Sequence, residues 1–255
     1  MVNLGLIGRR LGHSFSKRFF ETKFSRENIE GSYGLYELGD ISEFPDFIAS
    51  HLELDGLNVT IPYKESVIPY LDDISDDARE IGAVNVIKIT RGHSGVPFLK
   101  GYNTDWKGFI ISSKPILSTD VYSALVFGTG GAAKAVGYAL SSIGIDVTYV
   151  SRYPRGKEDT ISYGDINKSM LERYHLIVNA TPLGMYPDTA SAPDIPYGDI
   201  NDSHMCLDIV YNPGVTEFMR RCAENGAAVK NGLGMLISQA EQAWQIWQTQ
   251  AAELD

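Results

Sequence analysis

The sequence predicts an α/β protein of two domains, with a long C-terminal helix that is free to pack back on the first domain. Strand-like and helix-like segments alternate through residues 1 to about 105, which favours a mainly parallel sheet. A strand, a glycine turn, an apolar helix and a second strand then follow over residues 123–152, as one βαβ unit. Apolar residues three or four positions apart between Leu233 and Leu254 indicate the terminal helix.

The first half contains four strand candidates, at residues 3–8, 31–38, 56–62 and 83–90. A helix is expected over 16–24, because phenylalanines recur there at helical spacing and either Ser14 or Ser16 can cap its start. Further helices are expected around 43–52 and 76–82. Residues 91–98 are predicted to form a turn.

The second half adds strand candidates at 175–181 and 204–210, with helices between them. Together with the βαβ unit, these segments predict a Rossmann-like doubly wound domain over residues 106–232. The first domain then comprises residues 1–105 plus 233–255.

The composition and net charge of the chain limit the kinds of ligand and the cellular location that are expected. The chain has 255 residues and a net charge of −10, so nonspecific nucleic-acid binding is not expected. Two cysteines, Cys206 and Cys222, make neither a disulfide framework nor a metal-ligand cluster, so no metal is expected. The Arg9–Arg10 pair is not followed by an apolar region, and no apolar run approaches a membrane span. These features predict a cytoplasmic protein.

The segment VFGTGGAAKA has the pattern of a dinucleotide-binding turn. Gly128 permits the tight turn and Gly130 lets the backbone approach a pyrophosphate, while the amides of Gly131 and Ala132 begin a helix whose positive end faces the anion. The pattern alone is also compatible with a plain strand-to-helix connection. Its place between a strand and a helix favours a cofactor site.

The end of the next strand favours NADP over NAD. An NAD site places an acidic residue about 20 positions after the glycines, but Ser151 stands there and the next acid is Glu158. Arg152 and Arg155 could hold a 2′-phosphate instead, because guanidinium groups suit that oxyanion. The alternative is a solvated basic turn.

The segment NVTIPYK places polar groups at the end of a short apolar strand. Asn58 and Thr60 alternate with apolar residues, a proline then ends the strand, and Lys64 follows. A lone lysine at such a place is usually an ordinary solvent-exposed residue without a functional role. Amide, hydroxyl and amine groups together suit a ligand rich in hydroxyls.

The chain as a whole resembles the shikimate dehydrogenase family. The resemblance is carried in order by GHSFSK, GLNVTIPYK, GAVN, GYNTDWKGF, GTGGAAKA, NATPLGM, DIVYNP and GLGMLISQA. It implies an NADP-dependent oxidoreductase that reversibly reduces 3-dehydroshikimate to shikimate in aromatic amino-acid (chorismate) biosynthesis. It also implies a monomer or homodimer, with the C-terminal helix returning to the first domain.

The resemblance assigns site residues as follows. The catalytic pair is Lys64 and Asp105. The substrate contacts are Ser14, Ser16, Asn58, Thr60, Lys64, Asn85, Asp105, Tyr211 and Gln239. The cofactor contacts are Asp76, Gly128, Thr129, Gly130, Gly131, Ala132, Ser151, Arg152, Tyr153, Arg155, Ile209 and Gly232.

Two positions depart from the family pattern, and some alternatives stay open. Lys17 stands where the family usually has a proline, and Ser151 where it has an asparagine. Asp105 could instead be the N-cap of a helix that begins at Trp106. The other functions considered are a quinate/shikimate dehydrogenase that uses NAD, and a weakly active NADP-binding paralogue with a sensing role.

Overall fold

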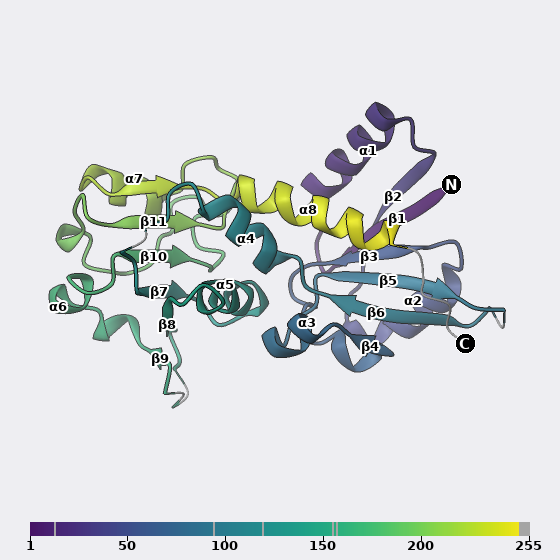
Figure 1. The fold of residues 1–255 in the computed structure, drawn as a ribbon, viewed down its shortest axis with the longest axis horizontal. Coiled ribbons are helices and arrows are strands. Elements are labelled where there is room, and N and C mark those ends of the chain that lie inside the picture. Colours follow the sequence, from purple (N-terminus) through teal and green to yellow (C-terminus); the bar gives the residue numbers. More distant parts are fainter. Residues whose placement is uncertain (13, 94, 119, 155, 157, 250–255) are drawn as a thin grey trace. The chain divides into compact units, whose positions relative to one another are not determined.

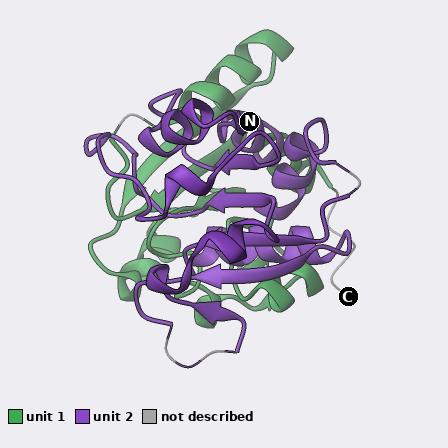
Figure 2. Cartoon of the chain, turned by 90° about the vertical axis from the view of Figure 1, so that its left-hand side faces the viewer, with its two compact units in different colours: residues 1–104, 240–255 green, residues 105–239 purple. Residues whose placement is uncertain are grey.

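The computed structural model describes residues 1–12, 14–93, 95–118, 120–154, 156 and 158–249 (Figure 1). The chain divides into two compact units, Met1–Thr104 with Ala240–Asp255, and Asp105–Gln239 (Figure 2). Each unit is built on its own six-stranded sheet with helices, which confirms the predicted α/β class. The second crossing between units falls inside helix α8 (Leu233–Gln248), whereas the predicted boundary at 232/233 precedes that helix. The predicted domain boundaries stay a prediction.

The first unit contains a mainly parallel sheet in the order β2-β1-β3-β5-β6-β4. Only β5 runs antiparallel to its neighbours, β3 and β6. The strands are β1 (Val2–Gly8), β2 (Gly31–Glu37), β3 (Gly56–Val59), β4 (Asp73–Ile74), β5 (Val86–Arg91) and β6 (Pro97–Tyr102). The predicted turn at 91–98 is therefore the connection of a β5–β6 hairpin, and its ends belong to strands.

Both faces of this sheet are covered, because successive side chains of a strand point to opposite sides. Ile7 of β1 belongs to the core cluster that includes helix α2 (Phe44–Ser50). Leu4 and Leu6 belong to the cluster on the other face, with helix α1 (Phe15–Glu27) and the C-terminal half of α8. Helix α3 (Asp76–Ile81) and the 3₁₀ turns Ile41–Glu43 and Ile68–Tyr70 complete the unit.

The second unit contains a fully parallel sheet in the order β12-β11-β10-β7-β8-β9. Its strands are β7 (Ser123–Phe127), β8 (Asp146–Val150), β9 (Thr160–Ile161), β10 (Leu176–Asn179), β11 (Met205–Asp208) and β12 (Ala228–Lys230). Counted within the unit, the order is 3-2-1-4-5-6, which is typical of the doubly wound class that was predicted. The strand order reverses between β7 and β10, where ligands bind beyond the carboxyl ends of the strands.

Helices cover both faces of this second sheet. They are α4 (Asp105–Ser113), α5 (Gly131–Ser141), α6 (Lys168–Leu171), α7 (Glu217–Glu224) and the N-terminal part of α8, with 3₁₀ turns at Tyr163–Asp165 and Tyr197–Asp199. Val126 and Phe127, adjacent on β7, enter two different core clusters. Among the described residues, no helix is long and apolar enough to cross a membrane.

Candidate active site

A chain of buried polar groups lies at the end of β3 in the first unit. Asn58 is only 5% exposed, and its Oδ1 accepts a hydrogen bond from the Tyr33 hydroxyl at 2.7 Å. Its Nδ2 donates to the backbone oxygen of Asn85 at 3.2 Å. The Asn85 side chain in turn bonds Thr104 through its Nδ2 (3.0 Å to Oγ1) and its Oδ1 (2.7 Å from the backbone N). The structure thus joins Asn58 and Asn85, two of the predicted substrate residues.

Thr60 and Lys64 follow Asn58 on the same segment, and both are half-buried. The Thr60 amide continues the pairing of β3 with β1 by donating to Ile7 O at 3.0 Å. The Lys64 carbonyl accepts from the Val84 amide at 2.7 Å, which ties the lysine's turn to the segment that leads into Asn85. Thr60, Lys64 and Asn85 therefore belong to one hydrogen-bonded region of the first unit.

Ser14 and Ser16 flank the first residue of α1. Ser14 is the N-cap, because its Oγ accepts from the Lys17 amide at 3.4 Å, and this resolves which of the two serines caps the helix. Ser16 lies within the first turn of α1. It opposes the rise that burial causes in the pKa of Tyr33, so its side chain lies near the phenol that bonds Asn58.

Asp105 and Gln239 belong to helices that pack together in the second unit. Helix α4 begins at Asp105 itself, so the alternative of a helix that begins at Trp106 is wrong. Gly108, one turn further on, approaches α8 so closely that an added Cβ would lie 2.7 Å from Met235 O. Asp105 and Gln239 are both buried, and the Gln239 Nε2 donates to Leu236 O at 3.1 Å.

The glycine turn connects β7 to α5 as predicted. Gly128 has a φ of +105°, a conformation that favours glycine, and an added Cβ would lie 3.1 Å from Ala180 O. Gly130 is the N-cap of α5 and supplies no side-chain cap, so the first-turn amides of the helix have no side-chain acceptor there. Thr129 and Gly130 are exposed, and Gly131 and Ala132 are half-buried. This arrangement fits a dinucleotide pyrophosphate.

The turn after β8 contains the residues predicted to bind the 2′-phosphate. Ser151 Oγ accepts from the Tyr153 amide at 3.1 Å, and the Tyr153 side chain is 73% exposed. Arg152 is exposed; burial raises the pKa of Tyr163 to about 12, and the charge of Arg152 opposes that shift. Arg155 lies outside the described residues.

Three further predicted residues lie at strand or helix ends. Ile209 follows β11 and donates its amide to Asn179 O at 3.0 Å, and the half-buried Tyr211 comes two residues later. Gly232 packs against this segment, since an added Cβ would lie 1.9 Å from Ile209 O. Asp76 is the exposed first residue of α3, in the first unit.

The sequence interpretation missed a buried carboxylate, Asp208, at the end of β11. Its oxygens accept from Thr216 Oγ1 (2.6 Å), the Val210 amide (2.9 Å) and Asn179 Nδ2 (3.1 Å). Burial raises the pKa of Asp208 to about 6, although these three hydrogen bonds favour the charged form. Asp208 thereby connects the loops after β10 and β11 to the start of α7. Its place at the start of the segment DIVYNP was the available sequence signal.

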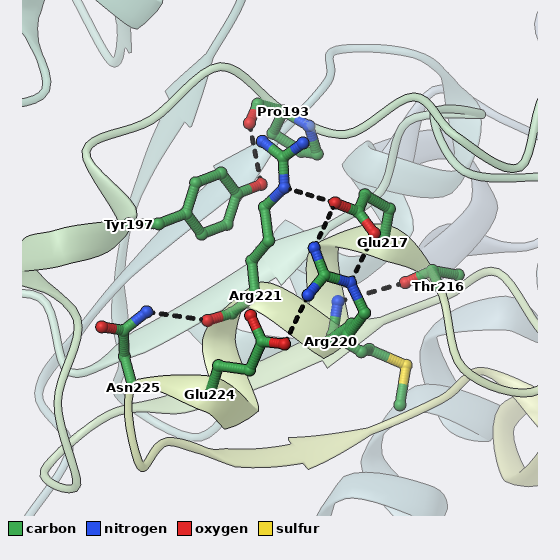
Figure 3. A network of polar contacts seen from close by, with 9 residues as sticks. Pro193, Tyr197, Thr216, Glu217, Arg220, Arg221, Glu224 and Asn225 are labelled. Atoms are coloured by element: carbon green, nitrogen blue, oxygen red, sulfur yellow. Dashed lines mark hydrogen bonds and ion pairs between the residues drawn. The ribbon is translucent and has the colours of Figure 1, made fainter.

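The start of α7 is fixed by a second set of contacts (Figure 3). Thr216 caps the helix by accepting from the Met219 amide at 3.3 Å. Glu217 bonds both Arg220 and Arg221, and these bonds lower the pKa of Glu217 to about 2. The two arginines are largely exposed, so solvent weakens their ion pairs with the half-buried Glu217, whereas the Thr216–Asp208 bond is buried.

The described part of the chain contains no cluster of three or more histidine, cysteine or acidic residues that could hold a metal ion. The polar groups of both units suit an organic ligand and a dinucleotide.

Comparison with known proteins adds independent findings. The family model described as "Shikimate dehydrogenase substrate binding domain" matches residues 6–87. The chain is 40% identical to shikimate dehydrogenase (NADP(+)) of Clostridium beijerinckii, over 96% of this chain and 91% of that protein. It is 35% identical to the protein of the same name from Methanococcus maripaludis, over 96% and 90%. The crystal structure of shikimate 5-dehydrogenase from Thermus thermophilus with NADP(H) and shikimate superposes with a TM-score of 0.84 at 29% identity, covering 97% of this chain and 94% of that one.

Proposed function

The chain belongs to the shikimate dehydrogenase family, and we propose on that premise that it catalyses the reversible NADPH-dependent reduction of 3-dehydroshikimate to shikimate. The observation that carries the proposal is the buried amide and hydroxyl chain of Asn58, Asn85 and Thr104, beside the segment of Lys64. Shikimate has three ring hydroxyls and one carboxylate. A site lined by groups that both donate and accept matches such a molecule and disfavours analogues that lack a hydroxyl.

The substrate residues have complementary proposed roles. Asn58, Asn85 and Gln239 would bond ring hydroxyls, with Thr60 and Tyr211 as further polar contacts. Ser14 and Ser16 would donate to the carboxylate through small neutral groups. This neutral recognition suits a chain whose net charge is −10, because it needs no cationic pocket.

The chemistry needs a proton on the carbonyl oxygen and a hydride on its carbon. NADPH supplies the hydride when bound, and the chain's own residues orient the ketone and supply the proton. The Lys64 ammonium would stabilise negative charge as it develops on the carbonyl oxygen and then donate the proton to that oxygen. Asp105 would accept a hydrogen bond from a neighbouring ring hydroxyl and so orient the substrate.

The cofactor residues divide into three groups. The amides that begin α5, from Gly131 onward, would hold the pyrophosphate. The turn with Ser151, Arg152 and Tyr153 would bind the adenine end, with Arg152 on the 2′-phosphate. Ile209, Gly232, Arg155 and Asp76 are proposed as the remaining cofactor contacts.

The test is an initial-rate assay with shikimate, 3-dehydroshikimate and quinate against both NADP(H) and NAD(H). We expect turnover of shikimate with NADP and much slower turnover with NAD, because the position that selects NAD carries Ser151 and not an acid. Turnover of quinate with NAD would instead support the quinate/shikimate dehydrogenase. Binding of NADP without turnover of either polyol would support the sensing paralogue.

We also propose that the enzyme acts in the cytoplasm, as a monomer or homodimer, within aromatic amino-acid biosynthesis. Cys206 and Cys222 are free and buried thiols, which suits a reducing compartment. Fractionation of cells and measurement of the solution mass would test these two statements.

A further inference from the structure

Tyr33 is a buried phenol that bonds a residue proposed to bind the substrate. It belongs to β2 and is 4% exposed, and its ring stacks on Phe20 of α1 with centroids 4.8 Å apart. Its hydroxyl donates to Asn58 Oδ1 at 2.7 Å. The phenol thus contacts Phe20 of α1 and Asn58 of β3.

The register of the sheet explains how Tyr33 reaches Asn58. Strand β1 lies between β2 and β3, with Leu4 opposite Tyr33 and Leu6 opposite Asn58. The tyrosine side chain therefore extends diagonally across β1, over the face that α1 covers. A long side chain with a polar tip is needed to bond a group two strands away.

The hydrogen bonds fix the direction of each donor. The Asn58 Nδ2 faces the Asn85 carbonyl, which can only accept, so Oδ1 must face Tyr33. The Tyr33 hydroxyl proton is therefore donated to Asn58 Oδ1. Burial raises the pKa of Tyr33, so its hydroxyl stays protonated and remains a donor.

We propose that Tyr33 is a positioning residue of the substrate site, whose hydroxyl fixes the orientation of the Asn58 amide. The inference rests on the proposed function, because it makes Tyr33 act on shikimate through Asn58. Without the phenol oxygen, the Asn58 amide loses the partner that sets its rotation, and its buried Oδ1 is left unpaired. Tyr33 is then a determinant of polyol affinity that need not touch the polyol.

The variant Tyr33→Phe tests this, because it keeps the ring on Phe20 and removes only the hydroxyl. We expect the KM for shikimate to rise by about tenfold, as for loss of one buried hydrogen bond, with kcat within about threefold and the KM for NADP unchanged. The matched control is Tyr63→Phe, which also removes a buried phenol that donates to a partner in the first unit, Leu38 O at 2.5 Å. That control should leave the KM for shikimate near the wild-type value.

A double-mutant cycle with Asn58→Ala shows whether Tyr33 acts through Asn58. In the Asn58→Ala background, Tyr33→Phe should raise the KM by less than about twofold, because the shared interaction is already lost. The inference is wrong if Tyr33→Phe raises the KM by the same factor in the Asn58→Ala background as in the wild type. It is also wrong if Tyr33→Phe leaves the KM unchanged, or if Tyr63→Phe raises the KM equally. Thermal unfolding confirms that each variant is folded. A wild-type chain that does not oxidise shikimate would refute the proposed function as well, whereas an active wild type with an unaffected Tyr33→Phe refutes the positioning role alone.

Discussion

Replacing Asp208 by asparagine should change how the stability of the protein depends on pH. The folded-state pKa of Asp208 is about 6, above its ordinary value of 3.8, because the carboxyl is buried. Between these two values the folded state holds a proton that the unfolded state has released. Asp208 therefore contributes stability at low pH that is lost as pH rises through about 6.

The magnitude follows from the width of that interval. Each pH unit over which only the folded state binds the proton changes the free energy of unfolding by about 1.4 kcal/mol. Between about pH 5 and pH 7.5, the free energy of unfolding of the wild type should therefore fall by about that much relative to Asp208→Asn. Urea unfolding at several pH values measures this difference. Subtracting the two free energies removes the contributions of groups that titrate identically in both proteins.

Asp165→Asn is the matched control for this measurement. Hydrogen bonds from Ser162 lower the pKa of this exposed aspartate, so it contributes stability above its unfolded pKa that is lost only under more acidic conditions. Its difference from wild type should be flat over the same pH range. A difference between wild type and Asp208→Asn that is equally flat would show that Asp208 is charged throughout, and would refute the argument from burial.

Three further substitutions test the proposed site. Lys64→Ala should reduce kcat by roughly 10² or more with a smaller change in KM, because it removes the proton donor; a near-normal kcat in the folded variant would make Lys64 an ordinary surface lysine. Arg152→Asp should weaken NADP binding at least about tenfold more than NAD binding in parallel titrations, since it removes a cation from the 2′-phosphate and adds repulsion; equal losses would show that Arg152 does not bind the phosphate. Gly232→Ala should cost about 1–3 kcal/mol in urea unfolding and weaken NADP, because its Cβ would lie 1.9 Å from Ile209 O; wild-type stability would show that this contact relaxes freely.

The sequence predicted those parts of the fold that repeat a local pattern. The βαβ unit, the apolar strands and the terminal helix all followed from periodicity and from glycine placement. Strand β6 was missed because it begins at Pro97 and contains Gly101, two residue types that strands disfavour. An added Cβ at Gly101 would lie 2.7 Å from Leu71 Cδ1 and 2.8 Å from Val84 Cγ2, so a larger residue there would require these side chains to move. Strands β4, β9 and β12 have two or three residues, too few to show a period.

The same distinction between local and long-range contacts applies to the residues of the candidate site. The glycine turn and the cap of α1 depend on neighbours in the chain. The sequence predicted the turn and limited the cap to Ser14 or Ser16. Tyr33 and Asp208 have partners 25 and 29 residues away, Asn58 and Asn179, and these partners become visible only once the strands are paired. Each of the two lies in a strand, where its residue type alone carries no indication of a buried hydrogen bond. Long-range polar contacts of this kind were therefore beyond the sequence interpretation.

The lysine at position 17, where the family usually has a proline, has a local structural consequence. Proline has no amide hydrogen, whereas the Lys17 amide donates to Ser14 Oγ and caps α1. This bond uses an oxygen lone pair of Ser14 and leaves the hydroxyl proton for another acceptor. A ligand carboxylate needs that proton and not the lone pair. The departure is therefore compatible with the proposed role of Ser14, because the cap uses the acceptor side of the serine and leaves its hydroxyl proton for a ligand carboxylate.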